Sequence, residues 1–309
     1  MTLSTMVVSN GFFFSLSGLN FTAEHKLVLF AVTSLYYVII WFVNVALILT
    51  IVTDRTLHDP MYVFLCSMCV SGLYGTSGFY PKFLKDLLSP AHVASYTECF
   101  LQSFVIYSSH PCDLSTLTLM AFDRYVAICL PLRYHSVMTK QRVALFVVFS
   151  WLLPLFCMFV NTVTVLQSDL CGSNIPKLYC SNYFISKLAC TPSVANTGVS
   201  FFNIVFYILH LVFILCSYIP LLRTCRRSNE GWNKFVQTCV PHLIALLNFG
   251  VATLFDLMYM RFGSLSLTQN LQNFMSIEVF LIPPIMNPLI YGLKLSKLQN
   301  KVHEFIHKK

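Results

Sequence analysis

Residues 120–129 read Met120-Ala121-Phe122-Asp123-Arg124-Tyr125-Val126-Ala127-Ile128-Cys129. In this stretch an acidic and a basic residue, Asp123 and Arg124, are neighbours at the end of a long run with few charges. Where a helix leaves a membrane, such a pair can neutralise itself at low dielectric, which holds the arginine until a partner offers a better contact. The alternative is a simple interfacial anchor, because Arg and Tyr are favoured at membrane boundaries. Both interpretations place this stretch at a bilayer surface.

The composition of the 309 residues excludes an ordinary water-soluble protein. Hydrophobic residues make up 56% and charged residues 10% of the chain, against roughly 45–50% and about 25% in a typical soluble domain. One core cannot hide so much apolar surface, so we expect much of it to contact membrane lipid. The 20 Lys and Arg residues fall in short clusters between apolar runs. This pattern does not indicate a nucleic-acid-binding face.

The length of the apolar runs predicts the fold. A helix needs about 20 apolar residues to cross roughly 30 Å of hydrocarbon, and seven segments meet this requirement: 27–52, 61–80, 98–122, 143–167, 199–222, 235–260 and 265–291. We therefore expect an all-α membrane protein, a seven-transmembrane-helix bundle over residues 27–291 with an extracellular N-terminus over 1–26. Residues 292–309 place apolar side chains among five lysines, which indicates a short amphipathic cytoplasmic helix. The alternative for this tail is a disordered basic segment.

The distribution of Lys and Arg sets the orientation of the seven spans. Fourteen of these residues fall on one side of the spans and six on the other, and the richer side is expected to face the cytoplasm. The N-terminus is then outside the cell, where the sequon Asn20-Phe21-Thr22 can be glycosylated at Asn20. No internal repeat supports the inverted-repeat architecture of many transporters.

Several motifs together resemble those of the rhodopsin-like G-protein-coupled receptors, and specifically of the odorant receptor family. Besides residues 120–129, they are Leu-His-Asp-Pro-Met-Tyr at 57–62, Ser-Tyr at 217–218 and Pro-Pro-Ile-Met-Asn-Pro-Leu-Ile-Tyr at 283–291. The motifs follow the family's order and spacing over nearly the whole chain. Gly-Leu-Tyr-Gly at 72–75 looks closest to fish-type members.

The resemblance implies a plasma-membrane receptor that binds small-molecule odorants in the outer half of the bundle. It further implies a stimulatory, olfactory-type G protein as the signalling partner, and no cofactor. The sequence shows no nucleophile turn, phosphate loop or metal-ligand spacing, so we expect no enzyme activity. Two alternatives stay open, a non-olfactory chemosensory receptor of the same fold and a small-molecule transporter, which would carry its substrate across the membrane.

The predicted coupling residues cluster at the inner ends of the spans. They are Asp123, Arg124, Tyr125, Tyr218, His242, Asn287, Pro288 and Tyr291. Pro288 removes a backbone donor and frees a carbonyl, which a polar neighbour such as Asn287 or water can satisfy, so a kinked helix end is expected. The resemblance implies that Tyr218 and Tyr291 move inward on activation.

Four cysteines are predicted at the outer surface. Cys99 lies 25 residues before Arg124, or about 37 Å of helix, so the two occupy opposite membrane surfaces. Cys171, Cys180 and Cys190 fall in the second outer loop. Four cysteines allow three connectivities, and free thiols are the alternative. The resemblance implies the pairs Cys99–Cys180 and Cys171–Cys190.

The predicted ligand site is placed by helix geometry. Ser103, Ile106, Tyr107 and His110 repeat at three- and four-residue steps and therefore share one face of the third span. Counting upward along the fifth and sixth spans brings residues of similar depth to this face, namely Phe202, Asn203, Phe206, Thr253 and Leu257. The result is an apolar cavity with a few polar groups. The alternatives are ordinary bundle packing and, for His110, a structural histidine.

An acidic residue inside the third span completes the set of candidate sites. Asp113 lies eleven residues before Arg124, about 16 Å along the helix and inside the membrane, where ionisable groups are costly and usually functional. The resemblance implies a sodium site built from this acid and a second acid in the second span. Gly72 stands at that second position, so only a weak sodium site is expected.

Overall fold

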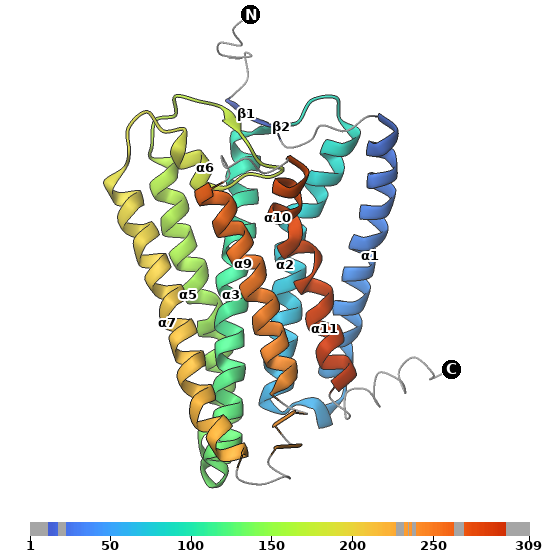
Figure 1. Cartoon of the computed structure of the whole chain (residues 1–309), viewed down its shortest axis with the longest axis vertical. Coiled ribbons are helices and arrows are strands. Elements are labelled where there is room, and N and C mark those ends of the chain that lie inside the picture. Colours follow the sequence, from blue (N-terminus) through green and yellow to red (C-terminus); the bar gives the residue numbers. More distant parts are fainter. Residues whose placement is uncertain are drawn as a thin grey trace, which may run out of the picture.

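The computed structural model describes residues 12–17, 23–226, 232–233, 235–236, 239–262 and 269–294. Its long helices are α1 (Ala23–Thr53), α2 (Pro60–Leu88), α3 (Tyr96–Cys129), α5 (Lys140–Leu166), α7 (Val194–Cys225) and α9 (Val240–Phe262), followed by α10 (Gln269–Leu281) and α11 (Pro283–Lys294). These helices run side by side along one direction, and α10 and α11 form two halves of one pass (Figure 1). The architecture is the predicted seven-helix bundle. Asn20 and residues 295–309 of the predicted tail lie outside the described residues.

Short helices complete the connections between the passes. They are η1 (Arg55–Leu57) after α1, η2 (Pro131–Arg133) and α4 (Tyr134–Val137) after α3, and α6 (Asn182–Lys187) between α5 and α7. Asp54 begins η1, since its carboxylate accepts a 2.9 Å hydrogen bond from the backbone N–H of Thr56. The chain after α3 bends by 113° into η2 and α4. This bend carries the inner loop back beneath the end of α3.

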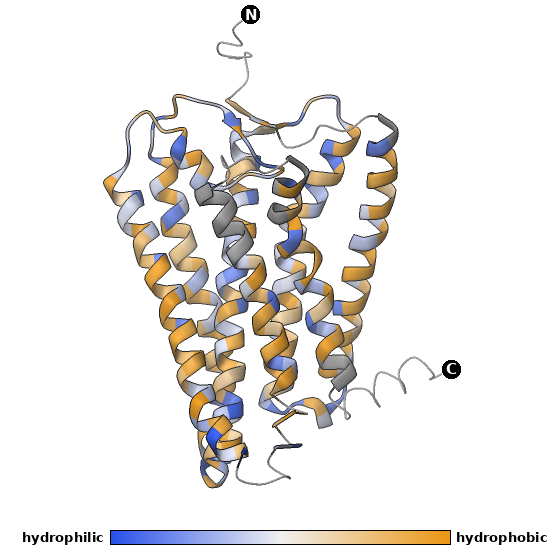
Figure 2. Cartoon of the chain, in the orientation of Figure 1, coloured by the Kyte–Doolittle hydropathy of each residue, from blue (hydrophilic) through white to orange (hydrophobic). Residues whose placement is uncertain are grey.

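Apolar side chains on the outside of the bundle fit a lipid environment. Within the described residues, α1, α2, α5 and α7 are each long and apolar enough to cross a membrane, and hydrophobic residues dominate α5 and α7 (Figure 2). Phe42 of α1 is 74% exposed and Leu215 of α7 is 65% exposed. In water such a surface would aggregate, whereas lipid tails solvate it.

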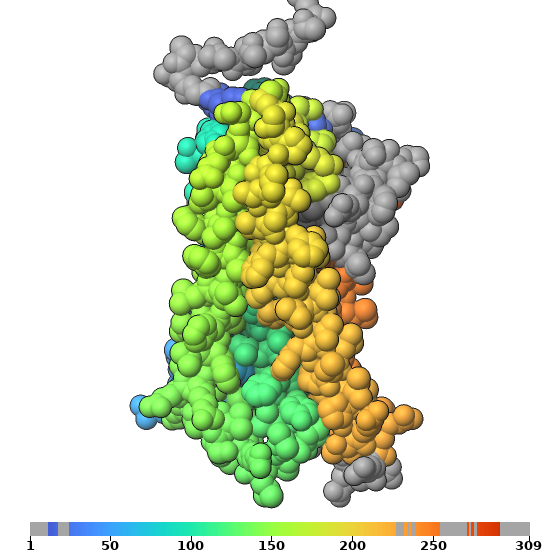
Figure 3. All heavy atoms as spheres, turned by 90° about the vertical axis from the view of Figure 1, so that its left-hand side faces the viewer, coloured from blue at the N-terminus to red at the C-terminus, as the bar shows by residue number. Residues whose placement is uncertain are grey.

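The third pass lies at the centre of the bundle. Helix α3 packs against α2, α5, α7 and α9, and Figure 3 shows it between α5 and α7 on one face of the molecule. Its contact with α2 depends on a small residue, because a Cβ atom at Gly75 would lie 2.5 Å from Oγ of Ser109. Small residues let two membrane helices approach closely without a hydrophobic driving force between them.

Polar side chains, rather than apolar length alone, set the start of α3 and the end of α2. Helix α3 begins at Tyr96 because Oγ of Ser95 accepts a hydrogen bond from the N–H of Glu98, whose carboxylate accepts one from the N–H of Ser95. Helix α2 continues beyond the predicted end at residue 80 as far as Leu88. The added turns carry an ion pair between Lys82 and Asp86, so the helix extends past the apolar run.

The outer end carries a small sheet that the sequence did not predict. Strands β1 (Phe13–Leu16), β2 (Val93–Ser95) and β3 (Asn174–Ile175) pair in the order β2-β1-β3, with β1 antiparallel to β2 and parallel to β3. Phe14 and Leu16 are buried while Phe13 and Ser15 are exposed. This alternation is the period of two expected for a strand with one covered face. The N-terminal segment is thereby tied to two outer loops.

Candidate functional site

The inner end of α3 holds a buried ion pair. Asp123 is fully buried and forms an ion pair with Arg124, whose Nε also donates a 3.0 Å hydrogen bond to the carboxylate. The hydroxyl of Tyr134, in α4, donates a second bond of 2.9 Å to the other carboxylate oxygen. The predicted pairing of Asp123 with Arg124 is present. Tyr134 was missed, because only the bend after α3 brings it to this position.

A chain of hydrogen bonds links three helices near that ion pair. Nε2 of His242 in α9 lies 2.9 Å from the backbone carbonyl of Leu117 in α3, and Nδ1 lies 2.6 Å from the hydroxyl of Tyr218 in α7. A carbonyl can only accept, so Nε2 carries the proton, and in the neutral ring Nδ1 accepts from Tyr218. His242 is fully buried. The contacts bring together His242 and Tyr218, both predicted as coupling residues.

The last pass breaks at a different proline from the one expected. Helix α10 ends at Leu281 and α11 begins at Pro283, with Pro288 inside α11. A proline restricts the residue before it, which explains the interruption at Ile282. Pro288 lacks the N–H that would bond the carbonyl of Pro284, and the side-chain amide of Asn44 in α1 donates a 2.9 Å bond to that carbonyl instead. The prediction was a polar neighbour such as Asn287 or water, and the polar group that the structure places at this carbonyl is Asn44.

A small cavity lies between α2, α3 and the last pass. It has a volume of about 30 Å³, enough for a water molecule, and Asp113, Asn287 and Gly72 are among its lining residues. Oδ1 of Asp113 and Oδ1 of Asn287 are buried and make no hydrogen bond within the described residues. Those residues contain no cluster of three or more His, Cys, Asp or Glu side chains suited to a metal. A sodium ion here would depend on one carboxylate with amide and water oxygens.

The predicted ligand face of α3 divides into two residues that are fully buried and two that are half-buried. Ser103 and Ile106 are fully buried, and Oγ of Ser103 donates a 2.8 Å bond to Asn182 Oδ1 and accepts one from its backbone N–H. Ser103 therefore holds the outer loop. Tyr107 and His110 are half-buried, with ring centroids 5.9 Å apart.

The predicted contacts on α7 and α9 are split between the inside and the outside of the bundle. Asn203, Phe206 and Thr253 are half-buried, whereas Phe202 is 56% exposed in a groove between α5 and α7. Counting depth along a helix does not set the helix face, and one residue rotates the side chain by about 100°. Phe202 is therefore corrected to an outward-facing residue. The side chains of Leu257 and Tyr291 lie outside the described residues.

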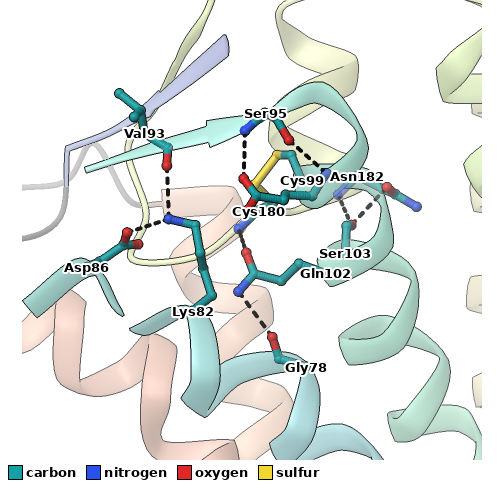
Figure 4. Close-up of a disulfide and its surroundings, with 11 residues drawn as sticks. Gly78, Lys82, Asp86, Val93, Ser95, Cys99, Gln102, Ser103, Cys180 and Asn182 are labelled. Carbon is teal, nitrogen blue, oxygen red and sulfur yellow. Dashed lines mark hydrogen bonds and ion pairs between the residues drawn. A yellow bond between two sulfur atoms is a disulfide. The ribbon is translucent and has the colours of Figure 1, made fainter. Parts of the chain in front are cut away.

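Two disulfides restrain the second outer loop, and one of them ties it to α3. The structure contains Cys99–Cys180 and Cys171–Cys190, the pairs that the resemblance implied. Around the first bridge, Gln102 accepts a 3.0 Å bond from the N–H of Cys180 and donates a 3.1 Å bond to the carbonyl of Gly78 (Figure 4). One glutamine thus joins the loop, α3 and α2.

Comparison with known proteins identifies the family. The family model described as olfactory receptor matches residues 33–309. Olfactory receptor 52B2 of Homo sapiens is 33% identical over 271 residues, 85% of this chain and 82% of the relative. Olfactory receptor 2K2 of Homo sapiens is 31% identical over 299 residues, 96% of this chain and 93% of the relative. The chain belongs to the olfactory receptor family.

Membership in the olfactory receptor family fits the geometry of the bundle. The chain is an odorant receptor, a multi-pass protein of the plasma membrane that acts through a G protein, and it is not an enzyme. A third relative agrees: olfactory receptor 1D2 of Pongo pygmaeus is 30% identical over 93% of this chain and 91% of its own length. The transporter and the non-olfactory receptor are thereby not favoured.

Proposed function

We propose that this olfactory receptor binds its odorant against the half-buried face of α3 and activates a stimulatory, olfactory-type G protein. The ligand would contact Tyr107 and His110 of α3, with Asn203 and Phe206 of α7 and Thr253 of α9 at similar depth. The rings of Tyr107, His110 and Phe280 form a continuous series, with centroids 5.9 and 6.1 Å apart. Aromatic walls with a few polar groups are typical of small-molecule sites.

The observation that carries the proposal is the hydrogen-bonded link between Leu117, His242 and Tyr218. Leu117 lies ten residues below Tyr107 on α3, or about 15 Å of helix. A shift of α9 relative to α3 must break or remake this link. An odorant that binds the two arrangements with different affinity therefore changes the polar contacts beside Arg124.

Three further features belong to the same proposal. Asn20 is glycosylated on the outside, because in the sequence it lies between β1, a strand of the outer sheet, and the start of α1. The basic and apolar tail, 292–309, contacts membrane lipid on the inner side, as its alternation of lysines and apolar residues suggests. Asp113 binds sodium weakly, since Gly72 offers no second carboxylate.

Expression of the full chain with a stimulatory olfactory G protein tests the proposal. Odorant mixtures should raise cyclic AMP, and Tyr107→Phe, His110→Ala and Asn203→Ala should each shift the potency of an active odorant by about fivefold or more, the loss of one hydrogen bond or contact. Leu101→Ala and Leu215→Ala are matched controls on the exposed sides of α3 and α7. Unchanged potency in all three site variants would place the ligand elsewhere.

A further inference from the structure

The break in the last pass leaves two backbone carbonyls without their usual helical donors. In an unbroken helix each carbonyl accepts from the N–H four residues later, so that of Phe280 would bond to Pro284, which has no N–H. The carbonyl of Leu281 would bond to Ile285, whose N–H instead donates to the carbonyl of Ile282 at 3.3 Å. Lipid offers no hydrogen-bond donor, so each freed carbonyl needs a partner from within the bundle.

Two tyrosine hydroxyls from neighbouring helices supply these partners. The hydroxyl of Tyr80 in α2 donates a 3.1 Å hydrogen bond to the carbonyl of Phe280. The hydroxyl of Tyr36 in α1 donates to the carbonyl of Leu281. Tyr80 is fully buried and its ring stacks on that of Tyr37 with centroids 4.7 Å apart. The break is therefore bonded to α1 and α2 through side chains instead of being closed within the helix.

Phe280 connects this arrangement to the proposed ligand face. Its ring stacks on that of Phe79, the neighbour of Tyr80 in α2, with centroids 4.5 Å apart and an angle of 3° between the planes. The same ring lies 6.1 Å from that of His110 and 5.4 Å from that of Tyr179. Two consecutive residues of α2 thus hold Phe280, one by its ring and one by its backbone carbonyl.

The hydroxyl of Tyr80 matters because of what its loss would leave behind. A buried carbonyl without any hydrogen bond costs more free energy than the bond itself contributes, so the chain at the break would rearrange, and Phe280 would move with it. We propose that Tyr36 and Tyr80 are positioning residues, which keep Phe280 in the wall of the odorant site by replacing backbone hydrogen bonds lost at the break. This inference rests on the proposed odorant site.

The dependence of Tyr80 on a proline gives a test that needs no odorant. Tyr80→Phe should lower the melting temperature of the purified full chain by about 2 °C or more, because it leaves the carbonyl of Phe280 unpaired. Pro284→Ala supplies an N–H for that carbonyl, so Tyr80→Phe should have less than half of its effect in the Pro284→Ala background. Equal effects in the two backgrounds would overturn the inference.

Tyr37→Phe is the matched control for this comparison. Tyr37 is half-buried and stacks on Tyr80, and its hydroxyl makes no hydrogen bond within the described residues. Its effect on the melting temperature should be small and should not depend on Pro284.

The response to an odorant tests the positioning role itself. Tyr80→Phe and Tyr36→Phe should each lower the potency of an odorant found active in the mixture screen by about fivefold, at normal surface labelling. Tyr37→Phe should leave the potency unchanged. Phe280→Leu should lower it at least as much, and adding Tyr80→Phe to Phe280→Leu should lower it little further, since the hydroxyl acts through Phe280.

The outcomes separate this inference from the proposed site. Unchanged potency in Tyr80→Phe and Tyr36→Phe, with the expected shifts in Tyr107→Phe and His110→Ala, would overturn the inference and leave the site intact. Fully additive losses in the double variant would also overturn it, because the tyrosine would then act independently of Phe280. Unchanged potency in all four single variants would contradict the proposed site and the inference together.

Discussion

The outer and inner ends of the bundle are held together by different chemistry. At the outer end, the Cys99–Cys180 disulfide bonds the second outer loop to α3, the Cys171–Cys190 disulfide closes that loop on itself, and a three-stranded sheet joins the N-terminal segment to two outer loops. At the inner end, the equivalent restraints are polar contacts, the ion pair of Asp123 with Arg124 and the hydrogen bonds of His242. Covalent bonds fix one geometry, whereas hydrogen bonds and ion pairs can exchange partners.

This difference suggests how the two ends divide the work of a receptor. A fixed outer end keeps the proposed ligand contacts Tyr107 and His110 in one arrangement, so that binding can discriminate between odorants. At the inner end the polar contacts can exchange partners, so two arrangements can differ in free energy by only a few kcal/mol. A ligand can then change which arrangement is the more stable. Breaking each end separately should therefore produce different defects.

The largest effect is expected from breaking the outer end. Cys99→Ser removes the bridge to Cys180, which closes a separation of 81 residues and stabilises the fold by about 4.5 kcal/mol on the chain-entropy estimate. Both sulfur atoms belong to fully buried residues, so the remaining thiol and hydroxyl would also be poorly placed. Surface labelling and the odorant response should both fall to near background.

Cys216→Ser is the control for that experiment. Cys216 lies on α7 with a free thiol and is exposed on the outside of the bundle. Its replacement should leave surface labelling and odorant response unchanged. Normal surface labelling of Cys99→Ser would show that the outer end does not need its covalent restraint.

The next largest effect is expected from breaking the inner end. Arg124→Ala should abolish the cyclic AMP response while surface labelling stays normal, because the helix keeps its packing and only the exchangeable charge is lost. Asp123 would then be left buried with the hydroxyl of Tyr134 as its neighbour. A radiolabelled or fluorescent odorant should still bind, which separates this defect from that of Cys99→Ser.

Asp123→Asn provides the matched contrast at the same end. It weakens the contact that holds Arg124, so signalling without odorant should rise by severalfold, of the order expected for one charged contact. Arg55→Ala, an exposed arginine on the same side, should change neither signal. Full signalling by Arg124→Ala would contradict the expected role of the Asp123–Arg124 pair in coupling to the G protein.

The sequence predicted the bundle well because one physical requirement dominates it. Each membrane pass needs an apolar run of sufficient length, and that requirement is local in the chain. The outer sheet was missed for the opposite reason. Its strands are two to four residues long, and Ser15 pairs with Asn174, so no local pattern carries the pairing.

The sequence predicted those features of the candidate site that depend on one helix, but not the partners that other helices supply. The sequence shows that Pro288 frees a carbonyl, but the donor is Asn44, which lies in the first helix. Depth along a helix selected both the half-buried Asn203 and its neighbour Phe202, which is 56% exposed and faces outward. Partners and helix faces depend on packing between passes, and packing is not encoded in the spacing of one helix.

The smallest effect concerns a charged cluster at the outer end and its dependence on pH. Nζ of Lys26 lies 3.2 Å from Nε2 of His92, and an ammonium can only donate, so the ring accepts at Nε2 and is neutral. Burial and the charge of Lys26 lower the pKa of His92 from its ordinary value of 6.5, with Asp86 opposing them. Below about pH 6.5 the unfolded chain therefore binds more protons at this residue than the folded protein does, so acidification destabilises the fold.

The destabilisation caused by protonating His92 should appear as a shift in the melting temperature of the purified receptor. Between pH 7.5 and 5.5, His92 should lower the melting temperature by about 1–2 °C, and His92→Gln should remove that part of the pH dependence because its amide oxygen can still accept from Lys26. His135→Gln is the control, since His135 is exposed at the inner end and its loss should change nothing. An identical pH dependence in His92→Gln and the unmodified receptor would show that the outer end is insensitive to this charge, and that its disulfides and sheet alone determine its stability.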